Sequence, residues 1–213
     1  IDNATGVAGI MEIAHAFTQQ PPKRSVLFAA VTLEESGLLG SKYYVADPVF
    51  PMNKTVGVIN LDAMSVIGKT RDFVVTGYGA SELEDILRPL AAAQGRELRS
   101  ETDIEKGFYF RSDHFNFAKA GVPALYAKSG GDHVEHGPAH GAAVSQDYIA
   151  NRYHKPGDKF DPNWDASGVV QDLEALYGVG RALTDGESWP NWYQGHAFRA
   201  LRDAERAKVT SEQ

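Results

Sequence analysis

The chain has 213 residues, a net charge of −7 and 43% hydrophobic residues. This length and apolar content allow one large domain or two small ones, with a sizeable core. The acidic balance and the lack of any Lys/Arg cluster argue against a nucleic-acid-binding surface. No apolar run is long enough to span a bilayer.

Cysteine is absent, so the chain has neither disulfides nor thiolate ligands. Any metal ion would therefore be held by His, Asp and Glu side chains. The chain opens at Ile1 without a methionine and runs almost at once into a helical pattern. We therefore expect it to be a fragment or a processed product.

The first half of the chain alternates helical and strand patterns. An amphipathic helix follows the capping residues 2–6 and ends by Gln20. The apolar run 26–31 is typical of a strand buried on both faces, and it is followed by Glu34 and Glu35. Further helices are predicted over residues 37–46 and 81–94, and further strands over residues 55–61 and 72–76.

The second half continues the alternation and is interrupted by one segment rich in Gly and His. We predict a strand and loop over 98–106, a short helix over 111–120, a strand over 122–127, a long loop over 129–149, and helices over 165–183 and from Trp189 to Arg206. This order predicts an α/β fold with a mostly parallel, mixed sheet and helices on both faces. We assign residues 1–185 to a catalytic domain and residues 186–213 to a helical C-terminal tail.

Acidic residues occur where such a sheet places a ligand site, beyond the carboxyl ends of its strands. Asp2 lies at a helix start, Glu34 and Glu35 follow one predicted strand, and Asp62 follows another. His154 lies in a later loop. If these groups converge, their repulsion would be destabilising without a cation. Oxygen and imidazole ligands make zinc the first candidate, with manganese or cobalt as alternatives.

Six segments stand out in their order along the chain: residues 2–8, 34–41, 60–62, 111–114, 121–124 and 153–158. Together they resemble the co-catalytic zinc aminopeptidase family. That family includes bacterial leucyl aminopeptidases, aminopeptidase Y, carboxypeptidase Q and glutamate carboxypeptidase. The resemblance runs from Asp2 to about Leu183.

The resemblance implies a set of metal ligands. Asp2 resembles the carboxylate that bridges two zinc ions, and Glu35 and His154 resemble the other ligands of one of them. Asp62 resembles a ligand of the second zinc. The resemblance also implies a cis peptide bond between Asp2 and Asn3.

The resemblance further implies catalytic roles. Glu34 resembles the general base that takes a proton from the metal-bound water, and Tyr153 resembles a tyrosine that stabilises the oxyanion. Arg111 and His114 open a predicted helix, and we consider them for the substrate pocket. The implied fold is that of zinc exopeptidases without its first strands.

One departure from the family concerns the second zinc, which also needs a histidine from an H-x-D segment upstream of the bridging aspartate. Only Ile1 precedes Asp2 here. We therefore expect two zinc ions in a full-length parent and one or none in this chain. Inactivity of the chain on its own is one of the outcomes we consider.

The resulting hypothesis is a zinc-dependent exopeptidase, with an aminopeptidase acting on peptides as its leading form. A glutaminyl cyclase with a single zinc and a non-catalytic binding module of the same fold are the alternatives. The resemblance suggests a secreted or periplasmic protein, and it leaves residue preference and oligomeric state open. The spacing of His133, His136 and His140 could chelate a metal, but the neighbouring glycines and proline favour a solvated loop.

Overall fold

A four-stranded mixed sheet forms the centre of the computed structural model, which describes residues 1–210. The strand order is β1-β4-β2-β3. The strands are β1 (Val58–Asn60), β2 (Asp72–Val75), β3 (Glu97–Ser100) and β4 (Ala124–Ser129). The pairs β1–β4 and β2–β3 are parallel, whereas β2 and β4 are antiparallel. The predicted α/β fold with a mostly parallel, mixed sheet is confirmed.

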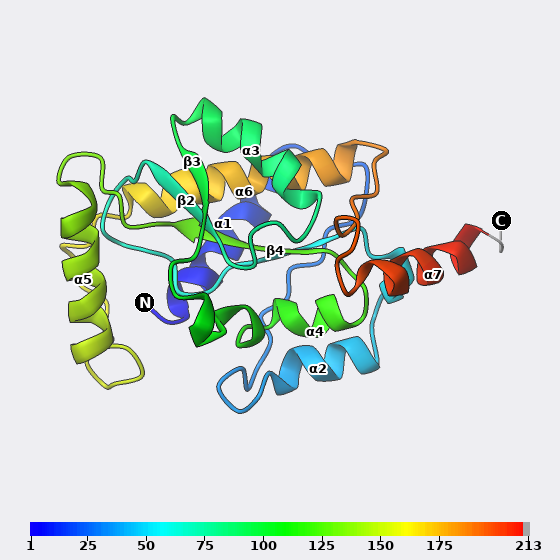
Figure 1. Cartoon of the computed structure of the whole chain (residues 1–213), viewed down its shortest axis with the longest axis horizontal. Coiled ribbons are helices and arrows are strands. Elements are labelled where there is room, and N and C mark those ends of the chain that lie inside the picture. The colour runs from blue at the N-terminus through cyan, green and yellow to red at the C-terminus, as the bar shows by residue number, and fades with distance from the viewer. Residues whose placement is uncertain (211–213) are drawn as a thin grey trace.

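Helices cover both faces of this sheet (Figure 1). One face carries α1 (Ala4–Gln19), α3 (Leu83–Ala93) and α6 (Ser167–Asp185). The other carries α4 (His114–Lys119), with α2 (Leu39–Ala46) packed on α4. Single 3₁₀ turns cover Met52–Lys54, Ile104–Lys106 and Phe108–Phe110. The helices α5 (Gly137–Asn151) and α7 (Arg199–Thr210) stand at opposite ends of the view in Figure 1.

The main core lies between the sheet and the helices α3 and α6. Its fully buried side chains include Phe73, Leu125, Leu83, Leu87, Leu176 and Val179. At about 25 cal/mol per Å² of apolar surface, such burial is the dominant stabilising contribution to the fold.

The other face of the sheet has a smaller apolar cluster around Trp192, which is fully buried. Its indole N–H donates to the carbonyl of Gly121 at 2.9 Å. The Arg202 side chain, from α7, donates to the carbonyls of Thr55 and Val56. The described part of the predicted tail therefore packs onto the sheet domain, and residues 211–213 lie outside the described residues.

The strand predicted over residues 26–31 is wrong. This segment lies outside the sheet, and Leu27 and Phe28 are 48% and 37% exposed. A strand needs a hydrogen-bonded neighbour, and within residues 1–210 the strand β1 pairs with β4 alone. An apolar run identifies a segment suited to a sheet but does not supply its partner.

The long loop predicted over residues 129–149 is also wrong, because most of it belongs to α5. Pro138 lies in the first turn, where a missing N–H costs the helix nothing. Gly141 packs against residue 131 so closely that an added Cβ would lie 2.1 Å from the Gly131 oxygen. The proline and this glycine mark the entry and the packing of a helix.

Among residues 1–210, no helix combines the length and the hydrophobicity needed to cross a bilayer.

Candidate metal centre

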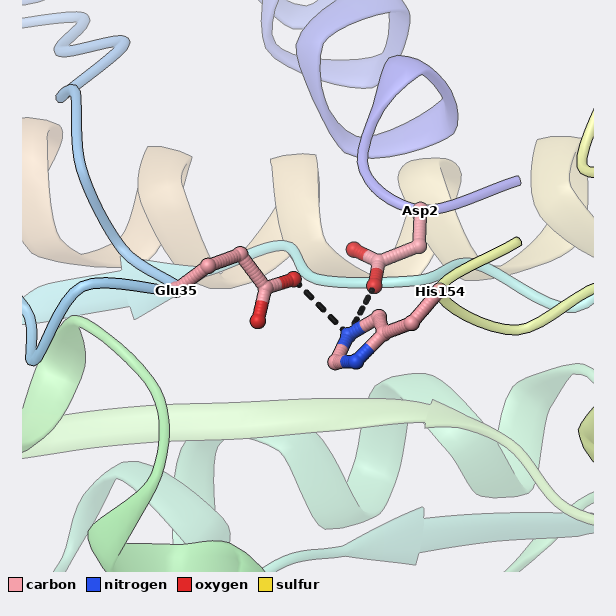
Figure 2. A group of neighbouring side chains, drawn as sticks. All are labelled: Asp2, Glu35 and His154. Atoms are coloured by element: carbon pink, nitrogen blue, oxygen red, sulfur yellow. Dashed lines mark ion pairs between the residues drawn. The ribbon is translucent and has the colours of Figure 1, made fainter. Parts of the chain in front are cut away.

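Three predicted ligands converge at one place, although they come from distant parts of the chain (Figure 2). The Nε2 atom of His154 lies 3.3 Å from Oδ2 of Asp2 and 2.8 Å from Oε1 of Glu35. One potential ligand atom from each of the three residues lies within 4.8 Å of the others. Figure 2 shows both carboxylates directed at the same imidazole nitrogen.

The position of Asp2 is fixed by contacts at the start of α1. Its backbone N–H donates to Oδ2 of Asp158 at 2.9 Å. The side chain of Asn3 donates to the carbonyl of Leu61 and accepts from the N–H of Ala63, at 3.0 and 3.1 Å. The bond between Asp2 and Asn3 is cis, as predicted. These contacts tie the start of α1 to the turn after β1.

That turn contains Asp62, which lies beside the three-residue group and is not one of its members. Its Oδ2 accepts a hydrogen bond from the Ser112 hydroxyl at 2.6 Å, and Ser112 accepts one from Asn60 at 2.7 Å. The ammonium of Lys128 donates to the carbonyls of Asp62 and Ala63, at 2.9 and 3.1 Å. Asp62 is therefore held both through its carboxylate and through its backbone.

The electrostatics of the site reflect several partly buried carboxylates. Burial and the neighbouring charges of Asp62 and Glu35 raise the pKa of Glu34 to about 7. The same causes raise the pKa of Asp2. A carboxyl group with a pKa near neutrality can both accept and release a proton at physiological pH.

The remaining predicted site residues lie in different environments. The Tyr153 ring stacks on His154, with centroids 3.8 Å apart, and burial raises the pKa of its hydroxyl. Arg111 is exposed, and its guanidinium lies 6.0 Å from the Phe108 ring. His114 is 1% exposed, and neither ring nitrogen has a hydrogen-bond partner within the described chain. Burial lowers the pKa of His114 to about 4, so it is a neutral core residue at pH 7.

Three residues that support the site are not among those predicted from the sequence: Tyr126, Lys128 and Asp158. The Tyr126 side chain is 8% exposed, and its hydroxyl donates to the carbonyl of Asp62 at 3.4 Å. Lys128 was detectable, because it is the one charged residue in the otherwise apolar and small-residue strand β4. Asp158 lies within the 153–158 segment, but nothing in its spacing indicates a contact with Asp2.

The residues present fit a zinc ion. Two carboxylates and one imidazole match the oxygen and nitrogen ligands that zinc accepts in proteins. Burial and mutual repulsion raise the pKa values of Asp2 and Glu34, and a divalent cation would relieve that repulsion. Both the types of ligand and the negative charge of the site therefore fit a bound divalent cation.

Comparison with known proteins places the chain among peptidases. Leupeptin-inactivating enzyme 1 of Streptomyces exfoliatus is 31% identical over 137 residues, covering 63% of this chain and 30% of that protein. A probable leucine aminopeptidase 2 of Aspergillus oryzae is 29% identical over 201 residues, covering 89% and 40%. The chain thus spans less than half the length of these curated relatives.

Solved structures with a similar fold are bacterial aminopeptidases. The aminopeptidase from Aneurinibacillus sp. strain AM-1 has a TM-score of 0.64 at 20% identity, covering 88% of this chain and 40% of that chain. Legionella pneumophila LapA aminopeptidase has a TM-score of 0.61 at 19% identity, covering 88% and 47%. Residues 1–177 match the sequence model of peptidase family M28, and the chain therefore belongs to that family.

Proposed function

We propose that this protein is a zinc-dependent exopeptidase that hydrolyses the N-terminal residue of peptides. The observation that carries the proposal is the convergence of Asp2 and Glu35 on Nε2 of His154. Membership in family M28 supports peptidase chemistry. Its similarity to proteins named aminopeptidases supports cleavage at the amino terminus of the peptide.

Asp2, Glu35 and His154 would hold the zinc ion, which supplies a Lewis acid and lowers the pKa of water. We further propose one zinc or none in this chain and two in a parent extended upstream. Asp62 would serve the second zinc, from its place beside the three-residue group.

Glu34 would act as the proton carrier. It adjoins Glu35 in the chain, and its raised pKa indicates an environment that favours a bound proton. It would accept a proton from the attacking water and deliver it to the departing amine. Tyr153 is protonated at neutral pH, as tyrosine ordinarily is, and burial raises its pKa further, so its hydroxyl can donate to the developing oxyanion. The acidic surroundings would attract a free amino terminus.

The proposal is tested by zinc content and by substrate choice. After buffer exchange that removes weakly held metal, elemental analysis should find at most one zinc ion in this chain and two in the extended parent. The parent should hydrolyse an aminoacyl chromogenic substrate and should not close a pyroglutamate-forming peptide. Glu35→Gln and His154→Asn should each lose this tightly held zinc, with His15→Asn on the exposed face of α1 as control. Ring closure without hydrolysis, or tightly held zinc retained by both variants, would contradict the proposal.

A further inference from the structure

A second histidine cluster lies where the chain enters α5, and it shares no residue with the proposed zinc centre. The rings of His133 and His136 are stacked, with centroids 4.7 Å apart and planes 11° from parallel. The His140 ring lies 4.9 Å from that of His136 and 5.1 Å from that of His133. The three rings line a pocket of about 340 Å³ together with Lys69 and Asp165.

The innermost ring, that of His133, is a support and not a metal ligand. It is 7% exposed, and its Nδ1 accepts hydrogen bonds from the backbone N–H groups of Glu135 and His136, at 3.1 and 3.0 Å. A neutral imidazole that accepts at Nδ1 carries its proton on Nε2. It therefore has no free lone pair for a metal. Its fixed face instead orients the His136 ring stacked on it.

The outer rings, those of His136 and His140, have the arrangement of a chelating pair. His136 caps the N-terminus of α5 and His140 lies in its first turn, and their ring centroids lie 4.9 Å apart. Two neighbouring imidazoles can supply two of the nitrogen ligands of one zinc ion. His136 is exposed and His140 is half-buried. Within residues 1–210, neither ring uses a nitrogen in a hydrogen bond with a protein acceptor, so their nitrogens are available.

Two acidic side chains and one basic side chain, that of Lys69, line the pocket, so its charge is net negative. An Oε2 atom of Glu135 lies 4.0 Å from Nε2 of His136, and Asp165 lines the same pocket. The N-terminus of α5 opposes a cation only weakly, because the helix-dipole effect is small at an exposed helix end. Nitrogen ligands select transition metals over calcium and magnesium.

We propose that His136 and His140 chelate a divalent transition-metal ion, with zinc and copper as the best candidates, at a second site in this protein. Water completes the coordination. Within the described chain, only Asp2, Glu35 and His154 bring three ligand atoms within 4.8 Å of one another. The second site is therefore the weaker of the two. Metal bound there ties together the first turn of α5.

The first test is a zinc titration in the Glu35→Gln/His154→Asn background, which removes the other centre, on a chain without a histidine tag. This protein should bind one zinc ion per chain. Adding His136→Asn and His140→Asn should weaken that binding by at least about tenfold, since outer-shell losses alone cost 10- to 100-fold. Adding His15→Asn should change nothing. The inference is overturned if the background protein binds no zinc, or if the added double substitution leaves binding unchanged.

A second test uses the background protein itself and so does not depend on the folding of the added variants. Substoichiometric Cu²⁺ should broaden the imidazole NMR signals of His136 and His140 first, because copper binds nitrogen sites more tightly than zinc does. The signal of His15, on α1, should stay sharp. Broadening that begins at His15, or that spreads evenly over all histidines, would overturn the inference.

Discussion

Each of the two proposed metal sites has a histidine near an end of α5, and the two are assembled in opposite ways. The proposed zinc centre (the M28 centre) brings Asp2, Glu35 and His154 together through the tertiary fold. The pair His136 and His140 is brought together locally, by the N-cap and the first turn of α5. The first site gathers several acidic groups, while the second consists of two imidazoles beside the buried ring of His133.

This difference shows what each site depends on. Any change that shifts α1 relative to the turn after β1 would displace Asp2 and Asp62 relative to each other, because the contacts of Asn3 tie these two segments together. The same change leaves a local pair on α5 intact. A substitution can therefore change zinc affinity at one site and leave the other unchanged. Within the M28 centre, a substitution can lower turnover without lowering zinc content.

The largest expected effect concerns Glu34 in the extended parent. Glu34→Gln removes the proposed proton carrier but no zinc ligand, so turnover should fall by roughly 10²–10⁴-fold. Zinc content should stay unchanged. The measurement pairs kcat on an aminoacyl chromogenic substrate with elemental analysis, and Glu12→Gln on the exposed side of α1 is the control. Near-normal turnover would show that Glu34 is not the proton carrier.

A third kind of histidine, His114, belongs to neither site and should control stability in acid. The pKa of His114 is about 4 in the fold against 6.5 for an ordinary histidine. The unfolded chain therefore binds this proton first as the pH falls, so stability is lost between pH 6.5 and 4. The loss amounts to about 3 kcal/mol by linkage.

His114→Phe should remove this acid sensitivity while keeping an aromatic ring among Tyr109 and Tyr126. The measurement is urea unfolding of the zinc-free protein at pH 7 and pH 4. The quantity that matters is the difference between the two pH values, compared between wild type and variant. His15→Asn is the exposed control. An equal pH dependence in wild type and His114→Phe would show that this ring is not the cause.

A smaller effect should separate the two metal sites. Asn3→Ala cuts the link between α1 and the turn that carries Asp62. Zinc affinity at the M28 centre should fall about tenfold, in the range seen for supporting residues. Zinc binding by His136 and His140 should not change. Parallel losses at both sites would mean that the two sites are coupled through the fold and are not independent.

The sequence predicted the centre better than it predicted the sheet. The motif order placed Asp2, Glu35 and His154 together, because ligand types at defined segments constrain which side chains must meet. The same reasoning failed for residues 26–31, where hydrophobicity indicated a strand but pairing depends on a partner elsewhere in the chain. It also failed at α5, because Pro138 and Gly141 break helices in most positions and are compatible with one here.

Supporting contacts were the least predictable part of the site. Lys128 could be singled out as a charge in an otherwise uncharged strand, but its target could not be inferred. Its three acceptors are two backbone carbonyls and the Tyr126 hydroxyl. Backbone carbonyls leave no trace in residue identity, so only the geometry of the turn after β1 reveals this contact.

The smallest predicted effect follows from that contact. Without zinc, the Lys128 ammonium offsets part of the negative charge of Asp2 and Asp62, whereas with zinc the two cations repel each other. Lys128→Met should therefore destabilise the zinc-free protein more than the zinc-bound protein. A difference of about 1 kcal/mol corresponds to a roughly fivefold gain in zinc affinity.

Zinc titration and urea unfolding with and without zinc measure this difference directly. Lys119→Met on α4, outside the acidic group, is the matched control. A loss of zinc affinity in Lys128→Met would mean that the lysine acts mainly by holding the turn that carries Asp62. A gain would mean that its charge competes with the metal, which is the result we expect because Asp62 keeps its contact with Ser112 in the variant.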